Sequence, residues 1–294
     1  MNLTGRRKSS NVEDRRSQGG GGGLGLPIGG KSLGIGGIII VGLITWLMGG
    51  DPISVVTQGL QGDVPSIQTT NGYQPTEEEN KLAEFSSQIL AGTEDIWAEQ
   101  FQRMGKTYRP PKLVLFHGSV RSGCGGATSA SGPFYCSADE TVYIDLSFFT
   151  SMQRQLGAGG DFAYAYVIAH EVGHHVQHLL GTLNEAHSRM QQVSEKEANQ
   201  ISVRLELQAD YFAGLWAYHD HSRFQSLEAG DIEEALNAAS VIGDDYLQKK
   251  ARGYAVPDSF NHGTSDQRYR WLKRGLETGN FEGANTFVQP YSQL

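Results

Sequence analysis

Cysteine and positive charge are both scarce in this chain. Only 2 of its 294 residues are Cys, and 24 Lys and Arg stand against 32 Asp and Glu, which gives a formal net charge of −8. Two cysteines cannot form a metal site made of Cys alone. An acidic chain with no basic, aromatic-interleaved stripe is also unsuited to binding nucleic acid. A hydrophobic content of 38% and an aromatic content of 10% are compatible with a packed core.

The two cysteines, Cys124 and Cys136, occur in a stretch rich in Gly and Ser. A disulfide between them would stabilise the fold by roughly 3 kcal/mol. It would persist only in an oxidising compartment, such as a bacterial periplasm. The alternative is a pair of reduced thiols in a cytoplasmic protein.

Positive charge gathers at the start of the chain. Residues 1–32 carry six Lys and Arg against two acids and include many glycines, which predicts a flexible cytoplasmic tail. Residues 33–50 are uncharged and rich in Ile, Leu and Val, which predicts one transmembrane helix of short spanning length. Asp51 follows this stretch, so the positive-inside rule sends the remainder of the chain outward, into the periplasm of a bacterium. A cleaved signal peptide and a buried helix are the alternatives.

The remainder of the chain divides into a linker over 51–75 and one domain over 76–294. Thr76 is a candidate N-cap for a helix that reaches about Met104. Three short β-branched or aromatic segments predict strands, and several amphipathic segments predict helices. The predicted strands cover 112–116, 134–136 and 141–145, and further helices cover about 231–252 and 265–277. The fold class is therefore α+β, mainly helical with a small sheet.

His170, Glu171 and His174 form an H-E-x-x-H pattern in a predicted helix with Asp161 as N-cap and Gly181 just beyond its end. Residues four apart share a helix face, so both imidazoles can reach one metal ion. The carboxylate beside them can act on a water held by that ion, which is the chemistry of a zinc hydrolase. The alternative is a core helix that carries buried histidines.

Two further histidines follow on the same helix. His175 points about 100° away from its neighbour and is expected to pack, cap or meet solvent. His178 lies about two turns from the first histidine and is a weak ligand candidate. Gln177 and Leu180 exclude the extended zincin pattern that requires Gly and His at these positions.

A catalytic zinc ion needs a third protein ligand. Glu206 is the best candidate, on a second predicted helix from about Glu195 to Tyr218. Asp210 lies one turn further on the same face and can accept a hydrogen bond from a ligand imidazole. A solvated acidic face is the alternative, which small neighbours such as Ala209 disfavour because they suit close helix packing.

A donor is also needed opposite the metal, where negative charge develops on the substrate. His262 is the best candidate, with Tyr254 and Tyr269 as weaker ones. Arg268 is expected to pair with Asp210 or with substrate. Ordinary helix capping in this loop is the alternative.

The two metal segments, 170–175 and 206–214, resemble those of the bacterial family of neutral zinc metallopeptidases of the YpfJ type. The likeness extends to 11–16, 132–136 and 260–265 and covers nearly the whole chain. It implies a membrane-tethered zincin that binds one Zn²⁺ per chain through His170, His174 and Glu206, with Glu171 as the catalytic residue.

Together these features predict a membrane-anchored zinc endopeptidase that acts on a peptide or protein. Zincins use a small sheet ahead of the metal helix, and an edge strand there can pair with an extended peptide. Residues 123–135 are expected to line the substrate cleft. Two alternatives stay open, a zinc-bound but inactive scaffold at the membrane surface and a zinc amidase acting on a cell-wall substrate.

Overall fold

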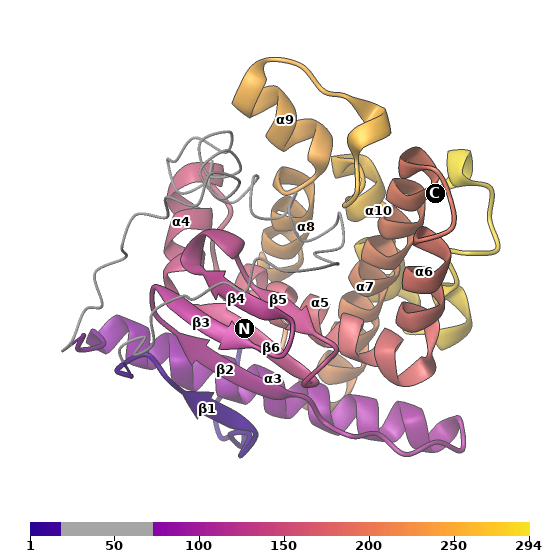
Figure 1. Ribbon diagram of the computed structural model, residues 1–294. Helices are drawn as coiled ribbons and strands as arrows, with labels where there is room; N and C mark the ends of the chain where they lie inside the picture. Colours follow the sequence, from indigo (N-terminus) through magenta and orange to yellow (C-terminus); the bar gives the residue numbers. More distant parts are fainter. Residues whose placement is uncertain (19–72) are drawn as a thin grey trace.

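The computed structural model describes residues 1–18 and 73–294, which form a mainly helical α+β fold with a small mixed sheet (Figure 1). The strands are β1 (Val12–Asp14), β2 (Lys112–Phe116), β3 (Ser119–Ser122), β4 (Gly125–Thr128), β5 (Phe134–Cys136) and β6 (Thr141–Asp145). The α-helices are α3 (Glu77–Arg103), α4 (Ser147–Leu156), α5 (Asp161–Leu180), α6 (Thr182–Met190), α7 (Glu195–Phe224), α8 (Asp231–Val241), α9 (Asp244–Arg252) and α10 (Ser265–Thr278). The three predicted strands are confirmed at the predicted bounds.

The main sheet has the strand order β1-β2-β6-β5. Strands β1, β2 and β6 run parallel, whereas β5 runs antiparallel to β6 at the sheet edge. Leu113 and Leu115 of β2 join the main core, and Val114 and Phe116 join a smaller cluster with Cys136. Both faces of β2 are therefore buried, which explains its continuous apolar sequence.

The helices make the main core around α5 and α7. Side chains from α3, α5, α7, α8 and α10 join those of the sheet in one buried cluster. Trp97, Trp216 and Trp271 are almost fully buried there, one each from α3, α7 and α10. The core thus holds α5 and α7, the two helices with the candidate metal ligands, in a fixed relation.

Several helix ends agree with the sequence. Thr76 caps α3 through a capping box with Glu79, as predicted. Gly181 ends α5 with φ 85°, a left-handed conformation that favours glycine. The predicted N-cap of α5 is wrong by one residue, because Gly160 is the N-cap and Asp161 is already helical. The N–H of Phe162 there donates to a Glu234 carboxylate oxygen from α8, at 3.2 Å.

The predicted helix over 231–252 is in fact two helices, α8 and α9. They are separated at Gly243, where a Cβ would lie 2.3 Å from the backbone nitrogen of Ser265. The chain therefore breaks its helix where it meets the start of α10. Helices α4 and α6, strand β1 and the β3–β4 hairpin are further elements that the sequence did not predict.

Residues 1–18 form part of the domain, which contradicts the predicted tail for this portion of 1–32. Strand β1 pairs with β2, and Val12 stands opposite Leu113. Arg6 forms two hydrogen bonds with the buried Asp220 of α7, at 2.7 and 3.1 Å. The earlier expectation failed because three strand residues and a few polar anchors leave little periodic signal.

This packing also bears on the predicted membrane topology. A single crossing between residues 18 and 73 would place the two described parts on opposite sides of a bilayer. Their contacts place the two described parts together, whereas the predicted topology separates them. The predicted transmembrane helix at 33–50 and most of the predicted linker lie outside the described residues. Within the described residues, no helix has the length and apolar character to cross a membrane.

Candidate metal centre

Helices α5 and α7 approach closely where the candidate ligands lie. A Cβ at Gly173 would be 3.1 Å from the Cα and carbonyl oxygen of Ala209, so glycine allows the two backbones to come together. His170 and His174 flank this point on α5, and Glu206 lies on α7 just before it. The close helix packing predicted from small residues is therefore present at the site.

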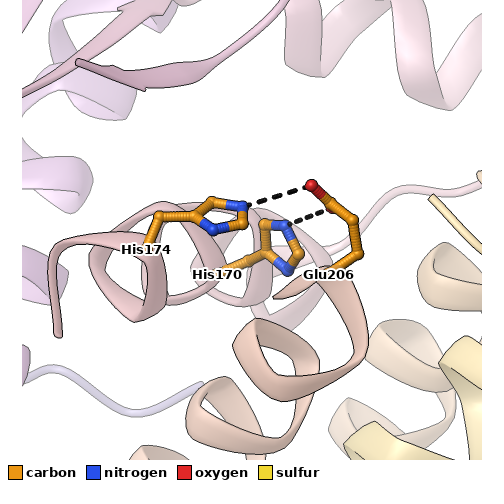
Figure 2. Close-up of side chains that lie close together, drawn as sticks. All are labelled: His170, His174 and Glu206. Atoms are coloured by element: carbon orange, nitrogen blue, oxygen red, sulfur yellow. Dashed lines mark hydrogen bonds and ion pairs between the residues drawn. The ribbon is translucent and has the colours of Figure 1, made fainter. Parts of the chain in front are cut away.

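His170, His174 and Glu206 converge on one point (Figure 2). Each offers a ligand atom, and these atoms lie within 4.8 Å of one another. The Nε2 atoms of His170 and His174 are 3.2 and 3.5 Å from the two Glu206 carboxylate oxygens. A tetrahedral zinc ion with bonds of about 2.1 Å separates its ligands by about 3.4 Å. The two nitrogens and the carboxylate therefore fit zinc in both chemistry and spacing.

Hydrogen bonds direct both histidine rings. The Nδ1 of His170 lies 2.8 Å from a carboxylate oxygen of Asp210, which can only accept. The Nδ1 of His174 lies 2.9 Å from the side-chain oxygen of Gln177, whose amide nitrogen donates to the Leu205 carbonyl at 2.7 Å. Each Nδ1 therefore carries a proton, and each Nε2 is the ring nitrogen turned toward Glu206 and the candidate metal position.

Asp210 is the centre of a buried polar cluster. It is fully buried and accepts from Tyr166 Oη at 2.6 Å and from two nitrogens of Arg268 at 2.8 and 2.9 Å. Burial raises the pKa of Asp210, but the charge of Arg268 and the hydrogen bond from His170 outweigh burial and lower it to about 2. Asp210 is thus a carboxylate at neutral pH. Of the two partners predicted for Arg268, Asp210 and the substrate, the structure shows Asp210.

The pKa values of two candidate ligands, His170 and Glu206, are also shifted by their neighbours. Burial disfavours the protonated ring of His170, but its hydrogen bonds to Asp210 and Glu206 raise its pKa to about 10. Burial raises the pKa of Glu206, yet nearby His174, His170 and His262 bring it well below its usual range. Glu206 is therefore a carboxylate at neutral pH and pairs with a cation, either the protonated His170 ring or a metal ion that takes the place of its Nε2 proton.

Glu171 follows His170 directly on α5 and is 9% exposed. Within the described part of the chain, no hydrogen bond or ion pair occupies its carboxylate. A buried carboxylate that is committed to no protein partner can accept a proton from a water held at the metal. The predicted position of the base is therefore consistent with the geometry.

His175 and His178 lie away from this centre. His175 is fully buried, with Nε2 at 2.6 Å from the Arg109 carbonyl and Nδ1 at 2.9 Å from Tyr135 Oη. Burial lowers its pKa to about 4, so it is neutral and structural. His178 lies 3.5 Å from Glu140 instead of facing the metal ligands.

His262 lies in the loop before α10, where Asp244 holds its Nδ1 at 3.2 Å. It is near enough to Glu206 for each to shift the pKa of the other. The predicted weaker candidates lie differently, since Tyr254 is 60% exposed beyond α9 and Tyr269 packs against the main core. Cys124 and Cys136 form the predicted disulfide.

Three supporting residues of the site were not predicted, namely Tyr166, Gln177 and Asp244. Tyr166 precedes His170 by one helical turn, and Gln177 follows His174 by three residues, so helical spacing carried a usable signal for both. Asp244 is far from every metal residue in sequence. Only the folded chain places it beside His262.

A buried His-His-Glu group with a free carboxylate, on two helices beside a small mixed sheet, defines a candidate zinc hydrolase of the α+β class. The comparison with protein families is more specific. The chain belongs to the family described as "Putative neutral zinc metallopeptidase", which matches residues 1–287.

Two relatives show how far the likeness extends. YpfJ of Escherichia coli K12, described as an uncharacterized protein, is 52% identical over 289 residues, which cover 98% of this chain and 99% of that protein. An uncharacterized protein of Mycobacterium tuberculosis is 43% identical over 190 residues, which cover 61% of this chain and 63% of that protein. No solved structure matches the chain significantly.

We expect Asp210→Asn to weaken zinc binding by about 10- to 100-fold, because an amide no longer fixes the proton on His170 Nδ1 or strengthens this ligand. A competition titration with a chelating dye measures the dissociation constant. Asp220→Asn is the matched control, since Asp220 is equally buried on α7 and pairs with Arg6. Equal zinc affinities of the two variants would show that Asp210 does not support the ligand.

Proposed function

We propose that the protein is a zinc-dependent endopeptidase. The observation that carries this proposal is the convergence of His170, His174 and Glu206 with an uncommitted carboxylate, that of Glu171, next to the first ligand. Zinc held by these three residues would polarise the scissile carbonyl group and lower the pKa of a bound water. Glu171 would accept a proton from a water at this centre and return it to the leaving amine.

The sheet supports a peptide as substrate. Strand β5 is the edge of the main sheet and has no strand partner on its outer side among the described residues. Tyr135 of β5 bonds to His175, the neighbour of His174, so this edge is tied to the metal helix. An extended peptide that added to β5 would run close to the candidate metal ligands. On this proposal, residues 123–135 contribute to the substrate cleft.

His262 is the proposed donor to the substrate carbonyl oxygen as negative charge develops on it. Its support is the position near Glu206 and the buried carboxylate of Asp244 behind the ring. A positioned donor of this kind contributes most to catalysis when it meets charge that is absent from the ground state.

The compartment and membrane attachment are separate proposals. The Cys124–Cys136 disulfide supports an oxidising environment outside the bacterial cytoplasm. Residues 1–18 would then share that compartment with the rest of the domain, because they pack on it. Attachment to the inner membrane through 33–50 rests on the apolar sequence of this segment.

Removal of the metal tests the proposed function directly. We expect the full chain to hold one zinc ion, to cleave members of a peptide library, to lose this activity with a chelator and to regain it with Zn²⁺. Elemental analysis measures the bound zinc, and mass spectrometry of the products measures peptide cleavage. One bound zinc ion without cleavage of any peptide would contradict the proposal and favour a scaffold, whereas cleavage confined to cell-wall amides would favour an amidase.

A further inference from the structure

Asp244, the first residue of α9, holds the loop that carries His262. One carboxylate oxygen accepts three successive backbone N–H groups, from Asn261 at 2.8 Å, His262 at 2.7 Å and Gly263 at 3.1 Å. The other oxygen lies 3.2 Å from His262 Nδ1. Asp244 is only 2% exposed. One buried side chain therefore sets both the backbone of this loop and the orientation of the imidazole.

The backbone at the start of α9 and the backbone of the loop that carries His262 also lie close together. The backbone N–H of Asp244 donates to the Gly263 carbonyl at 2.8 Å, so the backbone of α9 is also hydrogen-bonded to this loop. A Cβ at Gly243 would lie 2.3 Å from the nitrogen of Ser265, so only glycine permits this approach. Asp245 accepts from the backbone and hydroxyl of Ser265 at 2.7 and 3.0 Å. The start of α9 and the His262 loop thus form one rigid unit.

This arrangement determines which ring nitrogen faces the site. A carboxylate only accepts hydrogen bonds, so Nδ1 of His262 carries a proton toward Asp244. Nε2 is then the ring nitrogen left to meet a substrate. Burial disfavours the charged ring, but Asp244 and, more weakly, Glu206 raise the pKa of His262 against the opposing charge of Arg268. The second proton, on Nε2, is therefore retained to higher pH than in a free histidine.

We propose that Asp244 is a positioning residue that fixes His262 with Nδ1–H toward α9 and Nε2–H toward the carbonyl oxygen of a bound peptide. The proposal rests on the proposed peptidase function. His262 touches the substrate, whereas Asp244 acts only through His262. The Nε2–H donates to the oxygen while negative charge develops there, and the neutral ring, once this proton is lost, no longer donates.

A pH dependence follows, with a definite sign. The charged groups that act on the pKa of His262 are Asp244 from α9, Glu206 from α7 and Arg268 from α10, and Asp244 also acts on the pKa of Tyr291. Because the protonated ring is the active form, kcat/KM falls as pH rises through the pKa of His262. Without the carboxylate of Asp244, this alkaline fall moves to lower pH.

The test compares Asp244→Asn with Asp245→Asn, which makes the same charge change one residue away. In Asp244→Asn we expect the pKa of His262 and the alkaline limb of kcat/KM to fall together, by roughly 1 to 3 pH units. In Asp245→Asn we expect the pKa of His262 and the alkaline limb of kcat/KM to be unchanged. Imidazole NMR signals of histidine-labelled full-chain protein, with and without Zn²⁺, report the pKa and the protonated nitrogen. His262→Gln identifies the signal.

The two readouts separate the possible failures. If His262 of the wild type titrates like a free histidine, or keeps its pKa in Asp244→Asn, the positioning role is overturned whether or not peptides are cleaved. The wild-type titration decides this even if Asp244→Asn fails to fold. If the NMR result is as expected but no peptide is cleaved, the pairing stands and the proposed peptidase function fails. A lower kcat in Asp244→Asn with an unmoved alkaline limb would reduce Asp244 to a structural role.

Discussion

Glu171→Gln is expected to lower peptide hydrolysis by about 10²- to 10⁴-fold while one zinc ion per chain remains bound. Glutamine has the shape of glutamate but cannot accept a proton from water at neutral pH. The candidate ligands are His170, His174 and Glu206, so the exchange is expected to remove the proposed base and leave the metal site intact. Single-peptide kinetics and elemental analysis of the same preparation measure the two quantities.

Glu185→Gln is the matched control for this variant. Glu185 lies on the neighbouring helix α6 and is exposed, so the same chemical change there should leave both activity and zinc content unaltered. Full activity in Glu171→Gln would exclude Glu171 as the base. Loss of zinc from Glu171→Gln would instead mean that the carboxylate contributes to metal binding, and the kinetic comparison would have to be repeated at saturating Zn²⁺.

Arg6→Ala is expected to lower the free energy of unfolding by about 3 kcal/mol, because it leaves a buried carboxylate without its partner. Asp220 is fully buried, and the two nitrogens of Arg6 supply its ion pair. The guanidinium also stacks over the Phe224 ring at 3.8 Å, and Gly92 leaves room for it, since a Cβ there would lie 2.8 Å from Arg6. Chemical denaturation of the full chain measures the change.

Lys8→Ala provides the comparison, since the Lys8 side chain is 56% exposed and pairs with Glu84, which is 53% exposed. An exposed pair of this kind is worth about 0–1 kcal/mol. If Arg6→Ala costs no more than Lys8→Ala, residues 1–18 do not contribute to stability in the way that their contacts imply. Zinc content should be unchanged in both variants, because neither side chain contacts the candidate metal ligands.

The candidate metal centre could be predicted from the sequence because its residues occur in pairs spaced one helical turn apart. His170 and His174 share a turn of α5, and Glu206 and Asp210 share a turn of α7, so each pair is readable within its own segment. The association of the two helices was harder to read. It depends on small residues such as Gly173 and Ala209. Such residues indicate that another helix packs closely, but they do not indicate which helix it is.

The parts that escaped prediction depend on contacts between distant segments. Strand β1 has Val12 as its only apolar residue and acquires its role from pairing with β2. The break at Gly243 is set by the approach of Ser265, which no local pattern reveals. The pairing of Asp244 with His262 has the same origin. Such features follow from tertiary structure and have no periodic signature of their own.

The first eighteen residues also affect how the protein folds. Their contacts reach residues synthesised much later, and the bond from Arg6 to Asp220 spans 214 positions. Strand β1 cannot pair before β2 is in place, and Arg6 cannot find its partner before α7 has formed. Contacts of this range slow folding, because the chain must close a long loop before the contact stabilises it. The residues made first are therefore expected to dock last, so that the newly made domain stays incomplete until most of its helices have assembled.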